Sequence, residues 1–215
     1  MSPVCVKICG LSNAATLDAA LEAGADLVGF VHFPKSPRHL SFEQGRSLAE
    51  QAKGRAERVV LLVDPDDALL AAAIDALDPD LIQLHGRETP QRVAAIRRLT
   101  GRPIMKAFGI ASAEDLHALS AYATVADRLL LDAKAPPGAD LPGGNGRTFD
   151  WALLRGAALP AGTMLSGGLD AENVAAALDS TGLTAVDVSS GVEIRPGEKD
   201  PTKIAAFIAA ARSRS

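Results

Sequence analysis

The sequence has 215 residues, 47% of them hydrophobic and 22% charged, so it has the composition of an ordinary globular protein with room for one large core. The net charge is −4 at pH 7 and Lys and Arg are scattered along the chain, which argues against a nucleic-acid partner. No apolar run approaches the ~20 residues of a membrane span and no signal peptide is expected, so we expect a cytoplasmic protein without a membrane partner.

Short runs of leucine and β-branched residues alternate with longer alanine-rich stretches that have helical spacing. The short runs predict strands at Val4–Ile8, Leu27–Phe33, Arg58–Val63, Leu81–Leu84, Pro103–Phe108, Arg128–Leu131, Thr163–Ser166 and Ala185–Val188. The longer stretches predict helices near residues 13–23, 42–53, 66–77, 90–99, 113–121, 149–156, 171–180 and 200–212. Helix-start signals support four of these helices, and they are Ser12, Ser112, Asp170 and Pro201.

Eight predicted strands alternating with eight helices favour an α/β fold of one domain over residues 1–215, a closed (β/α)8 TIM barrel. An open doubly wound sheet is the alternative, but no G-x-G-x-x-G follows the first strand. The Pro- and Gly-rich segment at 135–146 is too short for a linker and is expected to form a loop that covers a substrate.

The two cysteines, Cys5 and Cys9, lie on one predicted strand. Four extended steps place their Cα atoms about 13 Å apart, and a disulfide needs less than about 7 Å. They cannot bridge each other within that strand. Cys5 is interpreted as core packing, and two cysteines alone do not make a metal site.

Polar and reactive residues gather where the predicted strands end, which is where barrel enzymes hold their active sites. The strand ends read Lys7-Ile8-Cys9-Gly10, Gln83-Leu84-His85-Gly86, Leu131-Asp132, Ser166-Gly167-Gly168 and Ser189-Ser190-Gly191, and Arg38 follows the second strand. An inward Lys7, two residues before Cys9, is expected to favour the thiolate. Asp187 on the adjoining eighth strand is expected to pair with Lys7.

These strand-end motifs, together with Gly143–Trp151 and Val186–Glu193, resemble the successive motifs of the phosphoribosylanthranilate isomerase family from residue 4 to about residue 208. The resemblance implies an Amadori rearrangement in tryptophan biosynthesis that needs no cofactor and no metal. It implies that Asp132 is the general acid that opens the furanose ring and that Cys9 is the general base that removes the C2 proton. Burial is then expected to raise the pKa of Asp132.

The implied substrate is a small phosphorylated molecule that also carries a carboxylate, so two anion sites are expected. Arg38 matches the family's ligand for the anthranilate carboxylate, and His85 is a second candidate contact, with Lys7 and Asp187 grouped with them as substrate-binding residues. The phosphate is expected at the loops after strands seven and eight. The candidate phosphate-binding residues are Gly144, Asn145, Gly146, Ser166, Gly167, Gly168, Ser189, Ser190 and Gly191.

Asn145 stands where the family usually has Thr, so only its backbone contact is carried over. The alternatives left open are another phosphosugar-binding barrel enzyme and a non-catalytic barrel in which Cys9 senses the redox state. The expected assembly is a monomer or a homodimer.

Overall fold

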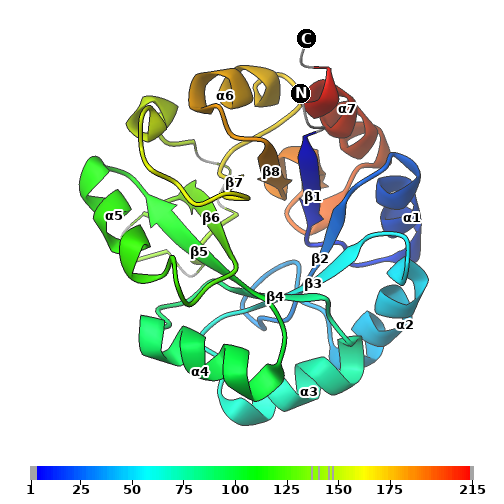
Figure 1. The fold of residues 1–215 in the computed structure, drawn as a ribbon. Helices are drawn as coiled ribbons and strands as arrows, with labels where there is room; N and C mark the ends of the chain where they lie inside the picture. Colours follow the sequence, from blue (N-terminus) through cyan, green and yellow to red (C-terminus); the bar gives the residue numbers. More distant parts are fainter. Residues whose placement is uncertain (1–3, 137, 140, 145, 147, 214–215) are drawn as a thin grey trace.

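The computed structural model describes residues 4–136, 138–139, 141–144, 146 and 148–213. In this part of the chain, eight parallel strands close into a barrel in the order β1 to β8 (Figure 1). The strands are β1 (Cys5–Cys9), β2 (Leu27–Val31), β3 (Glu57–Leu62), β4 (Leu81–Leu84), β5 (Ile104–Ile110), β6 (Arg128–Ala133), β7 (Met164–Leu165) and β8 (Ala185–Val188). The predicted TIM barrel is therefore confirmed.

Helices surround the barrel, as the ring of coiled ribbons in Figure 1 shows. They are α1 (Ala14–Glu22), α2 (Phe42–Ala52), α3 (Asp67–Leu77), α4 (Pro90–Thr100), α5 (Ala113–His117), α6 (Val174–Thr181) and α7 (Pro201–Arg212). Short 3-10 helices lie at η1 (Ala118–Ala121), η2 (Trp151–Leu154) and η3 (Ser190–Val192). The last helix, α7, packs against α1 and closes the ring.

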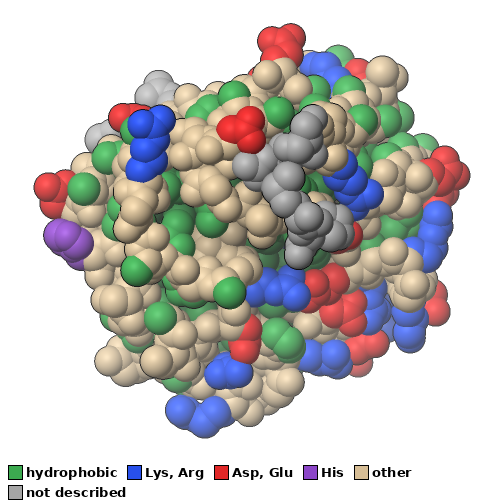
Figure 2. All heavy atoms as spheres, turned by 45° about the horizontal axis from the view of Figure 1, so that its top comes forward, with side chains coloured by type: hydrophobic (Ala, Val, Ile, Leu, Met, Phe, Trp, Pro, Cys, Tyr) green, Lys and Arg blue, Asp and Glu red, His purple; other side chains and the backbone are tan. Residues whose placement is uncertain are grey.

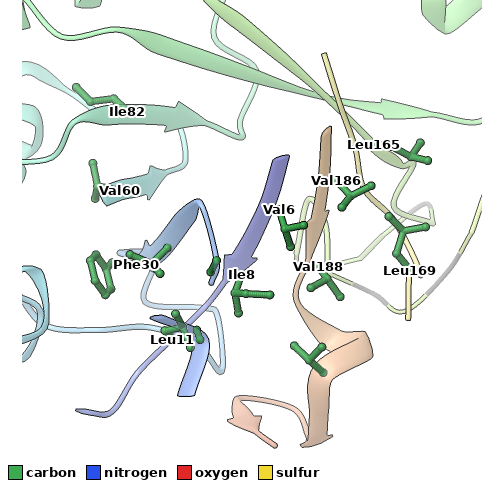
Figure 3. Close-up of a cluster of buried hydrophobic side chains, with 14 of the residues drawn as sticks. Val6, Ile8, Leu11, Phe30, Val60, Ile82, Leu165, Leu169, Val186 and Val188 are labelled. Carbon is green, nitrogen blue, oxygen red and sulfur yellow. The ribbon is translucent and has the colours of Figure 1, made fainter. Parts of the chain in front are cut away.

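The strands have two buried faces, because side chains alternate between the barrel interior and the helices. Val6, Ile8, Val186 and Val188 point outward into the layer between strands and helices, where Figure 3 shows them side by side. The inward positions of β1 are Cys5, Lys7 and Cys9, which alternate with them. The apolar layer thus fixes which side chains face the interior.

The helix predicted near residues 149–156 is wrong, because only the single 3-10 turn η2 forms there. Leu153 and Arg155 donate backbone bonds to the residues three positions earlier, which is the 3-10 pattern. Gly156 then takes φ of 71°, the left-handed conformation that ends the turn. The chain therefore leaves the helical path after a single turn.

Two helix starts also differ from the prediction. Asn13 caps α1 in place of Ser12, since its Oδ1 accepts a 2.9 Å hydrogen bond from the N–H of Thr16. The helix predicted at 171–180 begins only at Val174, because Asp170 Oδ1 accepts hydrogen bonds from two successive N–H groups and holds a turn before it.

A short antiparallel hairpin that the sequence did not predict follows η3. It consists of β9 (Glu193–Arg195) and β10 (Glu198–Lys199). Gly197 at its turn packs so closely on the β2–α2 loop that an added Cβ would lie 2.4 Å from the carbonyl oxygen of Pro37. The hairpin therefore braces the loop that carries Arg38.

Candidate active site

A cavity of about 650 Å³, its open mouth included, lies at the carboxyl ends of the strands. Most of the predicted site residues line it: Cys9, Arg38, His85, Asp132, Gly144, Ser166, Gly167, Gly168, Asp187, Ser189 and Ser190. Lys7, Gly146 and Gly191 are described but do not line it. Asn145 lies outside the described residues. The strand ends thus bring together side chains that are far apart in the sequence.

A polar chain runs below the floor of this cavity. Lys7 is fully buried, and its Nζ donates a 2.7 Å hydrogen bond to Asp187 Oδ1. Ser166 Oγ donates a 2.9 Å bond to the other oxygen of Asp187. Burial opposes the ammonium, but the Asp187 carboxylate raises the pKa of Lys7 above its usual value. The expected ion pair is therefore present, and the Ser166 hydroxyl is turned toward Asp187.

Cys9 ends β1 and is 4% exposed. Burial raises the pKa of its thiol above the ordinary value, and the nearby Asp187 carboxylate acts in the same direction. Lys7 and the more distant Lys199 lower the pKa, but less than burial raises it. Lys7 thus favours the thiolate, as expected, but burial outweighs its effect. The pKa of the Cys9 thiol therefore lies above its ordinary value.

Asp132 lies on β6 and is 4% exposed. Burial raises the pKa of its carboxyl to about 7, and the negative charge of Asp187 adds to this effect. A hydrogen bond of 2.8 Å from the N–H of Ala133 to Oδ1 acts in the opposite direction. A large fraction of Asp132 is therefore protonated near neutral pH, which is the state a general acid needs.

His85 follows β4, and its Nε2 lies 3.6 Å from Asp132 Oδ2. Burial lowers the pKa of His85 to about 4, and the buried Lys106 ammonium contributes. His85 is therefore neutral at pH 7. Its Nε2 is buried and has no hydrogen-bond partner among the described residues. A neutral imidazole with an unused nitrogen beside Asp132 can accept a hydrogen bond from a ligand or donate one to it.

Arg38 comes from the loop between β2 and α2 and is 5% exposed. Its Nε and Nη2 donate hydrogen bonds of 2.7 and 2.8 Å to the two carboxylate oxygens of Glu193. Gly10 lets the loop approach, because with φ of 78° its added Cβ would lie 2.7 Å from Arg38 Cδ. One edge of the guanidinium is thus already occupied within the protein.

The glycine-rich loops after β7 and β8 pack against each other and against β6. A Cβ on Gly167 would lie 2.5 Å from the backbone nitrogen of Ala133, and one on Gly191 would lie 1.9 Å from the carbonyl oxygen of Leu169. Gly191 therefore serves packing beneath the cavity, whereas Gly167 and Gly168 also line it. Ser190 begins the single turn η3 and lines the same cavity as Gly167 and Gly168.

Three buried polar residues that the sequence did not single out belong to the site. Gln83 lines the cavity, and its Oε1 has no hydrogen-bond partner in the described part of the chain. Its position two residues before His85 on the same strand face was a usable signal. Glu193 and Lys199 lie on the unpredicted hairpin, and nothing local in the sequence indicated that Glu193 would contact Arg38 or that Lys199 would contact Glu193.

The charged side chains on the outside are mixed in sign, as the face shown in Figure 2 illustrates. Among the described residues, no helix is long and apolar enough to cross a membrane. The same residues contain no group of three or more His, Cys, Asp and Glu side chains arranged to hold a metal ion.

Comparison with known proteins adds independent findings. A family model described as N-(5'phosphoribosyl)anthranilate (PRA) isomerase matches residues 6–210. The N-(5'-phosphoribosyl)anthranilate isomerase of Azorhizobium caulinodans is 62% identical over 208 residues, which cover 97% of this chain and 91% of the relative. The crystal structure of phosphoribosyl anthranilate isomerase from Thermotoga maritima is 34% identical with a TM-score of 0.86, and the match covers 98% of this chain and 100% of the other.

A second solved structure shows a phosphoribosyl anthranilate isomerase in complex with reduced 1-(o-carboxyphenylamino)-1-deoxyribulose 5-phosphate. This chain is 33% identical to it with a TM-score of 0.85, and the match covers 98% of this chain and all of the other.

Proposed function

This chain belongs to the N-(5'-phosphoribosyl)anthranilate isomerase family, which makes it an isomerase of tryptophan biosynthesis, and we propose that Asp132 and Cys9 make the two proton transfers of its Amadori rearrangement. The reaction converts N-(5-phosphoribosyl)anthranilate into 1-(2-carboxyphenylamino)-1-deoxyribulose 5-phosphate. The observation that carries the proposal is the pair of buried groups, one acid of raised pKa and one thiol, that line one cavity.

In the first step, the Asp132 carboxyl donates its proton to the furanose ring oxygen. The bond between C1 and the ring oxygen breaks, its electron pair stays on that oxygen, and the anthranilate nitrogen supplies the pair that forms an iminium ion. A pKa of about 7 suits this role, because Asp132 is then protonated in the free enzyme and ionises readily near neutral pH.

In the second step, Cys9 acts after its own proton has passed to solvent, and the thiolate removes the C2 proton. The resulting enolamine tautomerises to the ketone as it loses the C2 hydroxyl proton and gains a proton at C1. The iminium cation formed in the first step favours the thiolate beside it, as Lys7 does from below. The raised pKa of Cys9 fits this order of steps, since the substrate itself brings a second positive charge beside that of Lys7. β6 lies three strands from β1 around the barrel, so acid and base approach the sugar from different sides.

Two anion sites are part of the proposal. Arg38 would bind the anthranilate carboxylate at the β2 side of the cavity, and His85 would contact the substrate beside Asp132. The phosphate would be held by backbone N–H groups of the loops at Gly167–Gly168 and Ser190, with Gly144 and Gly146 nearby. A Cβ on Gly146 would lie 3.8 Å from Ser190 Oγ, which supports its place beside this site.

We propose that residues 1–215 form a single isomerase domain located in the cytoplasm and that it acts as a monomer or a homodimer. Size-exclusion chromatography with light scattering measures that assembly directly.

The test of the proposed roles is turnover of N-(5-phosphoribosyl)anthranilate, followed by the loss of its fluorescence. Cys9→Ser and Asp132→Asn are expected to lose at least about a thousandfold in kcat, in the range that general acid/base groups contribute. Cys5→Ser is the matched control, because Cys5 shares the strand and its inward face but lies at the other end of the barrel. Wild-type turnover in both site variants would end the proposal and favour a non-catalytic role for Cys9.

A further inference from the structure

Glu193 is a buried carboxylate that contacts Arg38 along the whole side edge of the guanidinium. Its two oxygens accept bonds of 2.7 and 2.8 Å from Nε and Nη2. Burial opposes the charge of Glu193, but the hydrogen bonds from Arg38 and Lys199 outweigh it and hold its pKa below the ordinary value. A two-point contact fixes the plane of a guanidinium as well as its position.

Lys199 holds Glu193 from the other side. Its Nζ donates a 2.8 Å hydrogen bond to Glu193 Oε1 and a 2.9 Å bond to the carbonyl oxygen of Ser189. Ser189 Oγ in turn donates to the carbonyl oxygen of Cys9 at 3.1 Å. These hydrogen bonds connect Glu193, through Lys199 and Ser189, to the ends of β1 and β8, and so they fix its orientation.

The arrangement decides which atoms of Arg38 remain for a ligand. Nη2 uses its second proton on the carbonyl oxygen of Gly144 at 3.3 Å, a long hydrogen bond. Nη1 lies beside Gly144, whose added Cβ would be 2.9 Å from it, and it takes no part in the two-point contact with Glu193. Arg38 thus presents the end of its guanidinium, led by Nη1, to the cavity that it lines.

The charges of Arg38, Lys199 and Glu193 together favour a ligand with a single carboxylate. Arg38 and Lys199 carry two positive charges and Glu193 carries one negative charge, so the buried group has a net charge of +1. A single carboxylate that approaches the end of the guanidinium neutralises this charge. A neutral aglycone leaves the charge buried and unpaired, which is unfavourable.

We propose that Glu193, anchored by Lys199, is a positioning residue that orients Arg38 for the carboxylate of the substrate's aglycone and so makes the enzyme select a monocarboxylate. The proposal rests on the proposed role of Arg38 as the ligand of that carboxylate. Glu193 is not among the residues that line the cavity, whereas Arg38, Cys9 and Asp132 are, so its removal is expected to weaken substrate recognition without removing the acid or the base.

The test compares two substrates that differ only in the carboxylate, N-(5-phosphoribosyl)anthranilate and N-(5-phosphoribosyl)aniline, with product measured by chromatography. In Glu193→Gln, KM for the anthranilate substrate is expected to rise about tenfold or more with a smaller change in kcat, and KM for the aniline substrate is expected to stay constant. Glu198→Gln is the matched control, because Glu198 is an acid of the same hairpin that pairs with Arg195 at the surface. It is expected to leave both KM values unchanged.

Arg38→Gln tests the role of Arg38 as carboxylate ligand separately from the role of Glu193 as positioning residue. If Arg38→Gln changes both substrates equally, the role of Arg38 as carboxylate ligand fails. If Arg38→Gln discriminates between the substrates and Glu193→Gln does not, only the role of Glu193 is overturned, and Glu193 is a structural residue. Should Glu193→Gln fail to fold, Glu193→Asp provides the same comparison, since it keeps the charge and withdraws the two-point contact.

The double variant Glu193→Gln/Lys199→Gln distinguishes orientation from charge. It restores the net charge of +1 around Arg38 but lacks the carboxylate that fixes the guanidinium. A persistent KM defect for the anthranilate substrate alone supports positioning. Recovery of the wild-type KM overturns it and assigns the effect to charge.

Discussion

Lys7 Nζ and Asp187 Oδ1 lie 2.7 Å apart inside the barrel, although 180 residues separate them in the sequence. Parallel pairing of β1 with β8 places the two residues in register. The positive charge of Lys7 lowers the pKa of Cys9, and the negative charge of Asp187 raises it. The pair therefore lowers the pKa of Cys9 less than an unpaired lysine would. The state of Cys9 is therefore set mainly by burial.

The first prediction concerns the titration of Cys9. Its rate of alkylation is expected to rise with pH with a midpoint above about 8.5, the value of an ordinary thiol, because burial disfavours the thiolate. Lys7→Met is expected to move the midpoint higher still, since it removes a cation that lowers the pKa. The measurement is made in a Cys5→Ser background so that only Cys9 reacts, and a midpoint below 7 contradicts the prediction.

The second prediction is a pH profile for turnover. The rate of the ring-opening step, which needs Asp132 alone, is expected to fall as pH rises above about 7, because Asp132 then loses the proton that it must donate. Asp187→Asn is expected to shift this decline to lower pH, since the Asp187 charge raises the pKa of Asp132. The exposed Asp75→Asn is the control. An unshifted profile in Asp187→Asn means that another group controls the alkaline limb.

The third prediction concerns stability. The pKa of Asp132 is about 7 in the folded state and 3.8 as its ordinary value, so the folded protein binds this proton more tightly than the unfolded chain. The resulting stabilisation is complete below pH 3.8 and is lost as pH rises through 7. The difference corresponds to on the order of 4 kcal/mol, since one pKa unit is about 1.4 kcal/mol.

Asp132→Asn removes this ionisation. Its free energy of unfolding relative to wild type is therefore expected to increase between pH 4 and pH 8, as measured by urea denaturation at each pH. A constant difference across that range is the result that would count against a raised pKa.

The fourth prediction uses His85. Burial and Lys106 keep its folded pKa near 4, below the ordinary 6.5, so its contribution to stability is present above pH 6.5 and is lost as pH falls toward 4. The ring resonances of His85 in NMR spectra are expected to titrate with a midpoint near 4. In His85→Asn, the free energy of unfolding is expected to fall less steeply below pH 6.5. A titration midpoint at 6.5 contradicts the assignment.

The fifth prediction is a steric one. A Cβ at Gly143 would lie 2.5 Å from His85 Cε1 and even closer to Asp132 Oδ2, so Gly143→Ala must displace the acid or the loop. We expect a loss of kcat of at least about tenfold, as small displacements of catalytic groups cause, with little change in Tm. Gly138→Ala in the same loop controls for backbone strain, because its φ of 80° disfavours alanine although an added Cβ there meets nothing within 4 Å. Equal kcat in the two variants argues against the contact.

The sequence predicted the barrel because each strand and helix carries its own local pattern. It also identified Cys9, His85 and Asp132, since each stands at a strand end, and barrel strand ends meet at one face. It wrongly predicted a helix near residues 149–156, where only one 3-10 turn forms before Gly156 adopts the left-handed conformation. Local propensity alone does not decide whether one turn extends into a helix.

The amino-acid order by itself determined the α/β alternation, the inward face of each strand and the residue types that meet at the cavity, because these follow from periods of two and 3.6 residues. Only the tertiary structure decided how the charges balance. Lys7 is compensated by Asp187, Arg38 by Glu193, and Glu193 by Lys199 across a hairpin that carries no strong local signal. Protonation states and free hydrogen-bonding edges depend on burial and on partners distant in sequence, and these exist only after the barrel has closed.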